Sequence, residues 1–237
     1  MRRLGQALRQ VVGTPAPQEG GEQHSYSALM NPRRRKVFEE LCLRPCLTAS
    51  QVAFGQKTSL QTARWHLEKL VQSGYLRVLP VRNKLVYSPA ELVREELVPL
   101  FVLLNEEKTY LSLRLVWRNP GLTLRELAQR AKMEAGVLRM RLRNLDRRRL
   151  VSIVVDGKFR RYFPQDAILT LNGSTRKEVR RFRRLLLMRL KADRLQPRIH
   201  LTRTRESQVE IQIGSLREVL RLPSEGALDF YLPPLAG

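Results

Sequence analysis

The chain has 237 residues, 43% of them hydrophobic, and a net charge of +22 from 44 Lys and Arg against 22 Asp and Glu. Such an excess repels itself in a compact fold, and solubility alone needs far less, so we expect a polyanionic partner. The only cysteines, Cys42 and Cys46, exclude a disulfide framework, and no apolar run approaches the roughly 18 residues of a membrane span. We therefore predict a cytoplasmic protein without a membrane partner.

The chain begins with a basic stretch, MRRLGQALRQVVG, that lacks the continuous apolar run of a signal peptide. Residues 13–25 are rich in Gly, Pro and polar residues, a composition that does not support a packed core. We therefore predict that residues 1–25 form a disordered, basic N-terminal segment.

Two later stretches match each other without a gap at a fixed offset of 75 residues. A register kept from Pro45 to Pro89 is hard to obtain by chance, so we infer an internal duplication. The matching pairs are Pro45 and Pro120, Leu47 and Leu122, Thr48 and Thr123, Ala53 and Ala128, Lys57 and Lys132, Arg64 and Arg139, Leu67 and Leu142, Leu70 and Leu145, Tyr87 and Tyr162, and Pro89 and Pro164.

Each copy is predicted to contain three helices, the first near 32–44 in the first copy. Thr48 with Gln51, and Thr123 with Glu126, have the spacing of a capping box, in which each side chain bonds the backbone amide of the other residue. The third helices are predicted near 59–72 and 134–148. A 4,3 spacing places their buried residues on one face: Ala63, Leu67 and Leu70, and Leu138, Leu142 and Leu145.

A two-stranded ribbon is predicted after each third helix. Gly74 suits a left-handed helix end, whereas Arg149 takes that place in the second copy at a conformational cost, so we expect the end of the second helix to differ. Residues 152–163 contain Asp156-Gly157 between β-rich arms, which is a strong hairpin signal. Residues 77–87 form a weaker version with a turn near Arg82-Asn83.

The remaining segments are predicted to be a linker, a basic helix and a neutral tail. Ser88-Pro89 is predicted to begin a linker helix that Pro99 kinks or breaks, a basic helix is predicted near 175–194, and residues 208–213 alternate like a strand. A degenerate third repeat in the neutral tail is an alternative. The predicted divisions are 26–89 and 105–164 for the two repeated domains, 90–104 for the linker helix, 165–196 for the basic helix, and 197–237 for a C-terminal segment serving dimerisation or partner contact.

The order helix, capped helix, helix and hairpin resembles the winged helix-turn-helix of ArsR/MarR-type, archaeal-like transcriptional regulators. The clearest local match is 48–76, with polar residues from Ser59 to Thr62, then His66-Leu67-Glu68-Lys69-Leu70 and Gly74-Tyr75-Leu76. The resemblance covers 30–89 and 105–164. It implies a mainly α fold with small β-hairpin wings: two tandem winged helix-turn-helix domains, a basic helix and a small C-terminal segment with β content.

In this fold the third helix enters the major groove and the wing meets the DNA backbone or minor groove. We therefore predict double-stranded DNA as the partner. Amide and hydroxyl groups can bond base edges, and arginine can also grip phosphate. The predicted contacts are Ser59, Gln61, Thr62, Arg64, Trp65 and Lys69 on the first third helix, Arg139, Arg141 and Arg143 on the second, and Arg82, Lys84, Lys158, Arg160 and Arg161 on the wings.

The two copies differ in their chemistry for reading DNA. Glu134 and Gly136 stand where the first copy has Ser59 and Gln61, so we predict that the first copy specifies sequence and the second anchors. Trp65 fits base stacking and core packing equally well. A helix histidine with satisfied contacts is the expected role of His66, rather than that of a ligand.

Three functions remain open from the sequence. The first is a DNA-binding transcriptional regulator, and the second is a weakly sequence-specific, nucleoid-associated architectural protein. The third is an assembly factor that binds protein or RNA, which the neutral tail motivates. A homodimer through the linker helix or the C-terminal segment also remains open, and no small-molecule effector is identifiable.

The sequence contains no Gly-rich phosphate loop and no Ser/His/Asp set, and its three histidines lie far apart. We therefore predict that the protein is not an enzyme and has no cofactor. Cys42 and Cys46 allow a metal-sensing alternative, because some ArsR-like proteins sense metals through cysteine pairs. Since there is no third thiol and no His or acid pair at ligand spacing, we predict no metal site.

Overall fold

Residues 28–201, 206–223, 228 and 231 are described by the structure, a computed structural model of the chain. The predictions for residues 1–25, and part of those for 197–237, lie outside the described residues. Within the described part, no helix is both long enough and apolar enough to cross a membrane.

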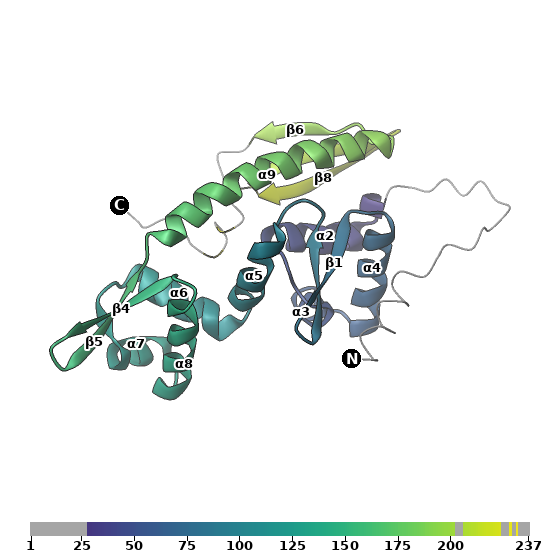
Figure 1. Cartoon of the computed structure of the whole chain (residues 1–237). Helices are drawn as coiled ribbons and strands as arrows, with labels where there is room; N and C mark the ends of the chain where they lie inside the picture. Colours follow the sequence, from purple (N-terminus) through teal and green to yellow (C-terminus); the bar gives the residue numbers. More distant parts are fainter. Residues whose placement is uncertain (1–27, 202–205, 224–227, 229–230, 232–237) are drawn as a thin grey trace.

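Two similar units lie at either end of the molecule (Figure 1). The first contains η1 (Ala28–Met30), α2 (Pro32–Leu43), α3 (Ala49–Gly55), α4 (Leu60–Gln72), β1 (Leu76–Val81) and β2 (Lys84–Pro89). The second contains α6 (Glu107–Arg118), β3 (Leu122–Thr123), α7 (Leu124–Ala131), α8 (Ala135–Asp146), β4 (Val151–Asp156) and β5 (Phe159–Pro164). A shift of 75 residues carries the bounds of α2, β1 and β2 onto those of α6, β4 and β5. The duplication is confirmed, and the fold is a mainly helical tandem winged helix with small antiparallel hairpins.

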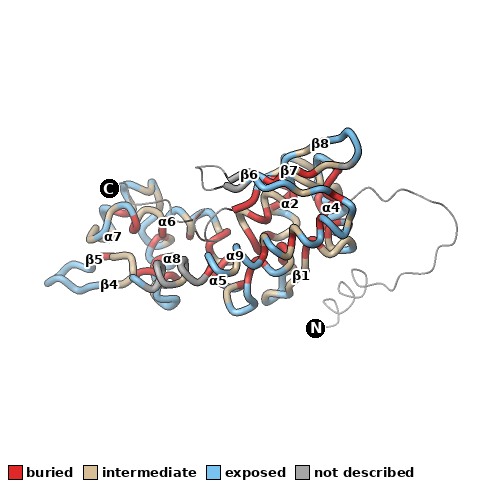
Figure 2. Tube along the Cα trace, turned by 90° about the horizontal axis from the view of Figure 1, so that it is seen from above, coloured by how far each residue is buried: buried red, intermediate tan, exposed pale blue. Residues whose placement is uncertain are grey.

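The same local bonds form both units. The backbone amide of Thr48 donates to Gln51 Oε1 over 2.9 Å, and the amide of Thr123 donates to Glu126 Oε2 over 2.7 Å. In each pair the threonine hydroxyl accepts the return bond, so both capping boxes are confirmed. Every residue of the two predicted buried faces on the third helices is at most 1% exposed, which is also as predicted. Figure 2 shows this burial in the interior of each unit.

The two units also share their strained backbone positions. Four positions with positive φ in the first unit recur 75 residues later, although glycine occupies different members of the pairs. A left-handed conformation costs a residue other than glycine about 1 kcal/mol, so chance repetition is improbable. The pairs are Cys46 (67°) and Gly121 (85°), Lys57 and Lys132 (both 49°), Gly74 (65°) and Arg149 (57°), and Arg82 (52°) and Gly157 (57°).

The predicted start of the linker helix is wrong. Ser88 and Pro89 belong to β2, where they pair with β1, and the following residues turn before the 3-10 turn η2 (Glu95–Leu97). Helix α5 (Val98–Leu104) begins only there, with Pro99 in its first turn. Because proline lacks the amide hydrogen that this turn leaves unpaired, Pro99 starts the helix and does not kink it.

After β5 the chain returns to cover the first unit. Helix α9 (Ala167–Ala192) is longer than predicted and leads into an antiparallel sheet of β6 (Arg198–Leu201), β7 (Glu206–Ile213) and β8 (Leu216–Pro223), in the order β6-β7-β8. This sheet rules out a third helix-turn-helix repeat there. Strand β8 packs on α2, where Arg35 forms a 2.7 Å ion pair with Glu218. In Figure 1, α9 runs from the second unit to above the first.

A buried polar network joins the two units at Asn105, the residue that follows α5. The Asn105 side chain donates to the carbonyl of Pro45 over 2.7 Å and accepts from the hydroxyl of Tyr231 over 2.6 Å. Gln51 donates to the backbone carbonyl of Asn105 over 3.1 Å. The ring of Tyr231, which is 1% exposed, also packs against Phe101 and Tyr110. The C-terminal segment thus holds the junction between the units.

We predict that Asn105→Ala lowers the free energy of unfolding by about 2–4 kcal/mol, because it leaves the buried Pro45 carbonyl unpaired and removes one acceptor of the Tyr231 hydroxyl. Tyr231→Phe removes only the hydroxyl and keeps the ring, so its cost should be smaller, at about 1–2 kcal/mol. Urea-unfolding midpoints of the two variants and the wild type provide the test. Equal stability of Asn105→Ala and wild type would contradict the network.

Candidate nucleic-acid interface

Helix α4 presents one polar face to solvent because its opposite face is fixed in the core. Ala63, Leu67 and Leu70 are fully buried, whereas Gln61, Arg64 and Lys69 are exposed on the other side. The structure thus places three of the predicted contacts on one accessible surface. Neither Gln61 nor Arg64 forms a hydrogen bond or ion pair with other described residues, so both side chains remain open to a partner.

Ser59 and Thr62 mainly build the start of the helix. The Ser59 hydroxyl accepts from the amide of Thr62 over 3.0 Å as the N-cap of α4, and the two hydroxyls lie 2.8 Å apart. Thr62 keeps a free lone pair whichever hydroxyl donates, whereas Ser59 has one site left, as donor or as acceptor. Part of the bonding capacity of both hydroxyls is thus used within the start of the helix.

Trp65 is both packed and open, which answers the even choice left by the sequence. Its ring is 48% exposed, lies edge-on to His66 at 4.9 Å between centroids, and carries the Arg34 guanidinium 5.7 Å from its centroid. A hollow of about 490 Å³ lies on this face of α4, lined by Gln61, Thr62, Arg64, Trp65 and Glu68. Arg34 was not among the predicted contacts.

Helix α8 of the second unit exposes arginines. Arg139 and Arg143 are exposed, as are Arg147, Arg148 and Arg149 just after the helix. Arg141 is different, because its guanidinium forms an ion pair with Glu106 at the start of α6 and its Nε is buried. Of the three predicted arginines on α8, the structure therefore brings Arg139 and Arg143 to the open surface and directs Arg141 into the unit.

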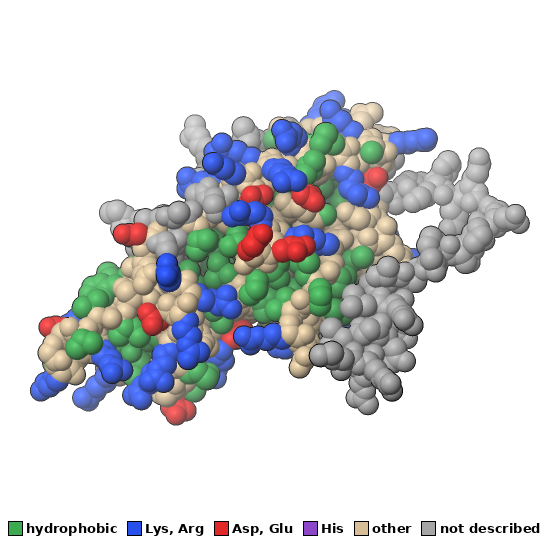
Figure 3. All heavy atoms as spheres, viewed as in Figure 1, with side chains coloured by type: hydrophobic (Ala, Val, Ile, Leu, Met, Phe, Trp, Pro, Cys, Tyr) green, Lys and Arg blue, Asp and Glu red, His purple; other side chains and the backbone are tan. Residues whose placement is uncertain are grey.

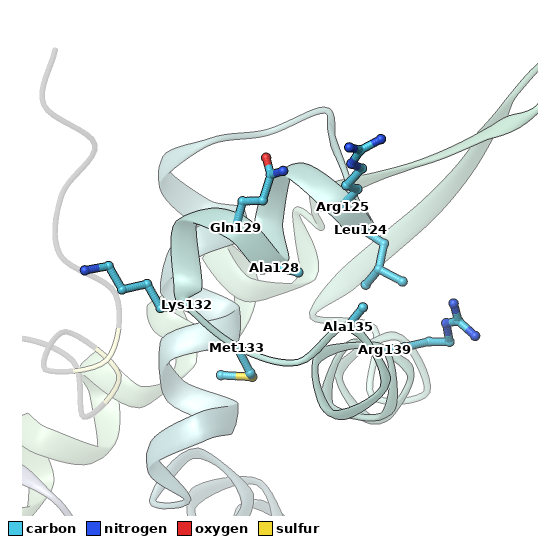
Figure 4. A pocket seen from close by; sticks show the side chains of 8 residues that line it. All are labelled: Leu124, Arg125, Ala128, Gln129, Lys132, Met133, Ala135 and Arg139. Atoms are coloured by element: carbon cyan, nitrogen blue, oxygen red, sulfur yellow. The ribbon is translucent and has the colours of Figure 1, made fainter.

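A hollow of about 530 Å³ lies between α7 and α8 (Figure 4). Leu124 and Ala135 point toward each other across it, whereas Arg125, Lys132 and Arg139 point away around its rim. An apolar floor with a cationic rim fits the sugar and phosphate of a nucleic-acid strand. Arg125 was not among the predicted contacts, because the contact between the two helices is not visible in the sequence.

The two wings differ at their tips. Arg82 and Lys84 are exposed at the β1–β2 turn, and Lys158 and Arg160 at the β4–β5 turn. Arg161 is held inside its own hairpin by a 2.6 Å ion pair with Asp156 and a bond to the carbonyl of Gly121. The second wing projects from the body, and Lys and Arg side chains gather over this unit (Figures 1 and 3).

The two cysteines are poorly suited to bind metal. Both thiols are buried, and burial raises the pKa of Cys46 to about 12, so the thiolate that a metal requires is disfavoured. The described residues also contain no group of three or more His, Cys, Asp or Glu side chains that could hold a metal ion.

No protein-family model matches the sequence. Among curated proteins, the chain is similar to an uncharacterized HTH-type transcriptional regulator of Methanocaldococcus jannaschii, with 24% identity over 141 residues. The match covers 60% of this chain and 35% of that protein, so the chain spans about a third of the length of the curated relative it matches. The chain is therefore a distant relative of a helix-turn-helix regulator.

Two solved structures show weak similarity. ScpB from Mycobacterium tuberculosis is 16% identical, with a TM-score of 0.23, over 58% of this chain and 92% of that one. A protein from Corynebacterium diphtheriae is 17% identical, with a TM-score of 0.22, over 58% of this chain and 27% of that one. TM-scores this low support no inference about function or arrangement.

His66 is expected to make the free energy of unfolding depend on pH. Burial, and then the charges of Arg34 and Arg33, lower the pKa of its imidazole, and Nδ1 has no partner in the described part of the chain. The unfolded chain takes up this proton near pH 6.5, whereas the folded chain takes it up only at lower pH. The contribution of uncharged His66 to the free energy of unfolding is therefore complete above about pH 6.5. It is lost as the pH falls towards the pKa of His66 in the folded chain.

We expect His66→Gln to lose less unfolding free energy than the wild type between pH 7.5 and pH 5.5. Urea unfolding of both proteins at both pH values measures the difference, and the carboxylates that they share cancel in the comparison. An equal loss in the two proteins would show that His66 is protonated at the same pH in the folded and unfolded chains.

Proposed function

We propose that this protein binds double-stranded DNA through its tandem winged helices and acts as a transcriptional regulator. The observation that carries the proposal is the exposed polar face of α4, where Gln61, Arg64 and Trp65 stand together opposite a fully buried face. A helix fixed in this way can lie in a major groove with its N-terminal half against base edges. The net charge of +22 supplies the attraction to phosphate.

In this proposal the two units divide the work. The first reads sequence, because Gln61 and Arg64 offer amide and guanidinium groups to bases and Trp65 offers an open ring. The second grips phosphate, because the exposed polar side chains from Arg139 to Arg149 are all arginine. The proposed contacts are Ser59, Gln61, Thr62, Arg64, Trp65 and Lys69 on α4, Arg139 and Arg143 on α8, and Arg82, Lys84, Lys158 and Arg160 on the wings. Arg141 and Arg161 add charge near the surface while holding their own unit together.

The alternative is an architectural protein that coats DNA, as in a nucleoid, with little sequence preference. The arginine-rich second unit favours it, whereas the mixed chemistry of α4 and the similarity to a regulator favour the first proposal. The assembly-factor alternative was based on a neutral tail that would be free to bind a partner. Described parts of this tail instead pack on α2 and at Asn105, which argues against that alternative. Four apolar residues of α5, namely Val98, Leu100, Phe101 and Leu104, are likewise buried within the chain, so the proposal needs no second copy.

Selection of binding sequences from random duplexes at physiological salt separates the two proposals. A regulator should enrich a defined site at least about 1,000-fold over random DNA, the lower end of measured specificity ratios. An architectural protein should bind selected and random duplexes within a few-fold of each other. A chain that binds neither class of duplex at this salt would overturn both.

Paired variants test the division of labour. Gln61→Ala with Arg64→Ala should weaken binding to the selected site by about 1–3 kcal/mol for each base-edge interaction removed, and should affect random duplexes less. Arg139→Ala with Arg143→Ala should weaken both duplexes alike and reduce the slope of log K against log salt by about 2, since each neutralised phosphate contributes about 0.9.

Fluorescence anisotropy between 50 and 200 mM salt measures both effects. Arg118→Ala, an exposed arginine at the end of α6, controls for the removal of charge. If the α8 pair altered sequence preference and the α4 pair altered only the salt slope, the assignment of the two units would be reversed.

A further inference from the structure

Helix α9 carries eight Lys and Arg residues and a single acid, Glu178. Its buried side is formed by Val179, Phe182, Leu186 and Leu190. Two of its arginines reach the first unit: Arg181 forms a 3.0 Å ion pair with Glu91, and Arg189 donates to the carbonyl of Ser73 and lies over the ring of Tyr75. Glu178 pairs with Arg94 at 3.5 Å. The only acidic residue of α9 is thus paired with Arg94 and does not neutralise the outer face of the helix.

Four other cations form a stripe along the outer face, namely Lys177, Arg180, Arg184 and Lys191, hereafter the α9 stripe. Their spacings of 3, 4 and 7 residues place them within a narrow sector of the helix, opposite the buried side. Each is exposed, and none forms a hydrogen bond or ion pair with the described residues. Like charges at such spacings repel each other by a few tenths of a kcal/mol per pair. The stripe is therefore an uncompensated cationic surface about 21 Å long.

We infer that the α9 stripe binds the backbone of a second DNA segment, so that one chain bridges two duplexes. This inference rests on the proposed function, because the first duplex occupies the winged helices. A duplex presents one negative charge per about 1.7 Å of its axis, so 21 Å of backbone offers ample phosphate for four cations. Because contacts to phosphate carry no sequence information, the stripe binds without reading sequence.

The position of α9 separates the two duplexes. Arg189 contacts the carbonyl of Ser73, and Asp193 accepts from the hydroxyl of Tyr75, so α9 sits at the C-terminal end of α4. The half of α4 that is proposed to read bases is its N-terminal half, near Ser59. The α9 stripe faces solvent, on the side of α9 opposite to its buried side. In Figure 1, α9 runs along one side of the molecule, while α4 and α8 lie below it.

The chemistry of the stripe favours DNA over an anionic membrane. A helix that lies in a membrane surface needs a broad apolar face with aromatic or leucine side chains. On α9 the only large apolar side chain that is well exposed among those described is Met188, and the other apolar residues are used against the body of the protein. The stripe thus offers charge with almost no apolar area.

A capture assay tests the bridge. A biotinylated duplex on beads is saturated with protein at about 0.15 M salt, and a fluorescent duplex of different sequence is then added. We expect wild-type protein to retain the second duplex and K177Q/R180Q/R184Q/K191Q to retain at least about tenfold less, since four phosphate-binding charges are removed. Binding to a single duplex at the winged helices should change by less than about threefold.

The matched control removes the same charge elsewhere. K108Q/R118Q/R198Q/R221Q neutralises four exposed cations outside the stripe and the proposed contacts, and it should still bridge. If the stripe variant retained as much of the second duplex as this control does, the inference would be wrong. A protein dimer that forms the bridge would give that result, and light scattering would detect it. Capture by the stripe of anionic vesicles or an acidic protein, but not of DNA, would also overturn the inference. If the protein bound one duplex but not a second, only the inference about bridging would be wrong. If it bound no duplex at all, the proposed function would be wrong.

Discussion

Burial of one face of each third helix is the constraint on which the surface of this protein depends. Leu67 and Leu70, and their equivalents Leu142 and Leu145, are at most 1% exposed. Burying each leucine contributes about 1.5–3 kcal/mol, so rotation of either helix about its axis would cost far more than any surface interaction returns. The polar and cationic residues on the opposite face therefore stay in solvent whether or not a partner is present.

The sequence predicted the repeated units well because they are built from local signals. Capping boxes, a 4,3 apolar spacing and Asp156-Gly157 each act within a few residues, and each was visible without tertiary information. The left-handed helix end at Gly74 was predicted, but the expectation that Arg149 would end its helix differently was wrong, since both residues have positive φ. Two further left-handed positions, at Lys57 and Lys132, carried no signal, because lysine does not mark them.

The errors concern contacts made between distant segments. Ser88-Pro89 has the local pattern of a helix start, but pairing with β1 extends β2 through Pro89. The ion pair between Arg141 and Glu106 joins α8 to the start of α6, and no spacing in the sequence indicates it. The C-terminal sheet was only partly foreseen for the same reason. Its one clear strand was read from alternation at 208–213, whereas its packing on α2 depends on the ion pair between Arg35 and Glu218.

The cations of this chain serve two purposes, and the surrounding contacts distinguish them. Arg35 and Arg141 each meet a carboxylate at a partly buried junction and join one element to another. On α4, α8, the wings and α9, most of the polar side chains that are exposed to solvent are cations without such a partner. A folding requirement explains the first group, since an arginine paired at a partly buried junction holds it in place. It does not explain the second group, whose mutual repulsion opposes folding, so these residues are best accounted for by the polyanion they bind.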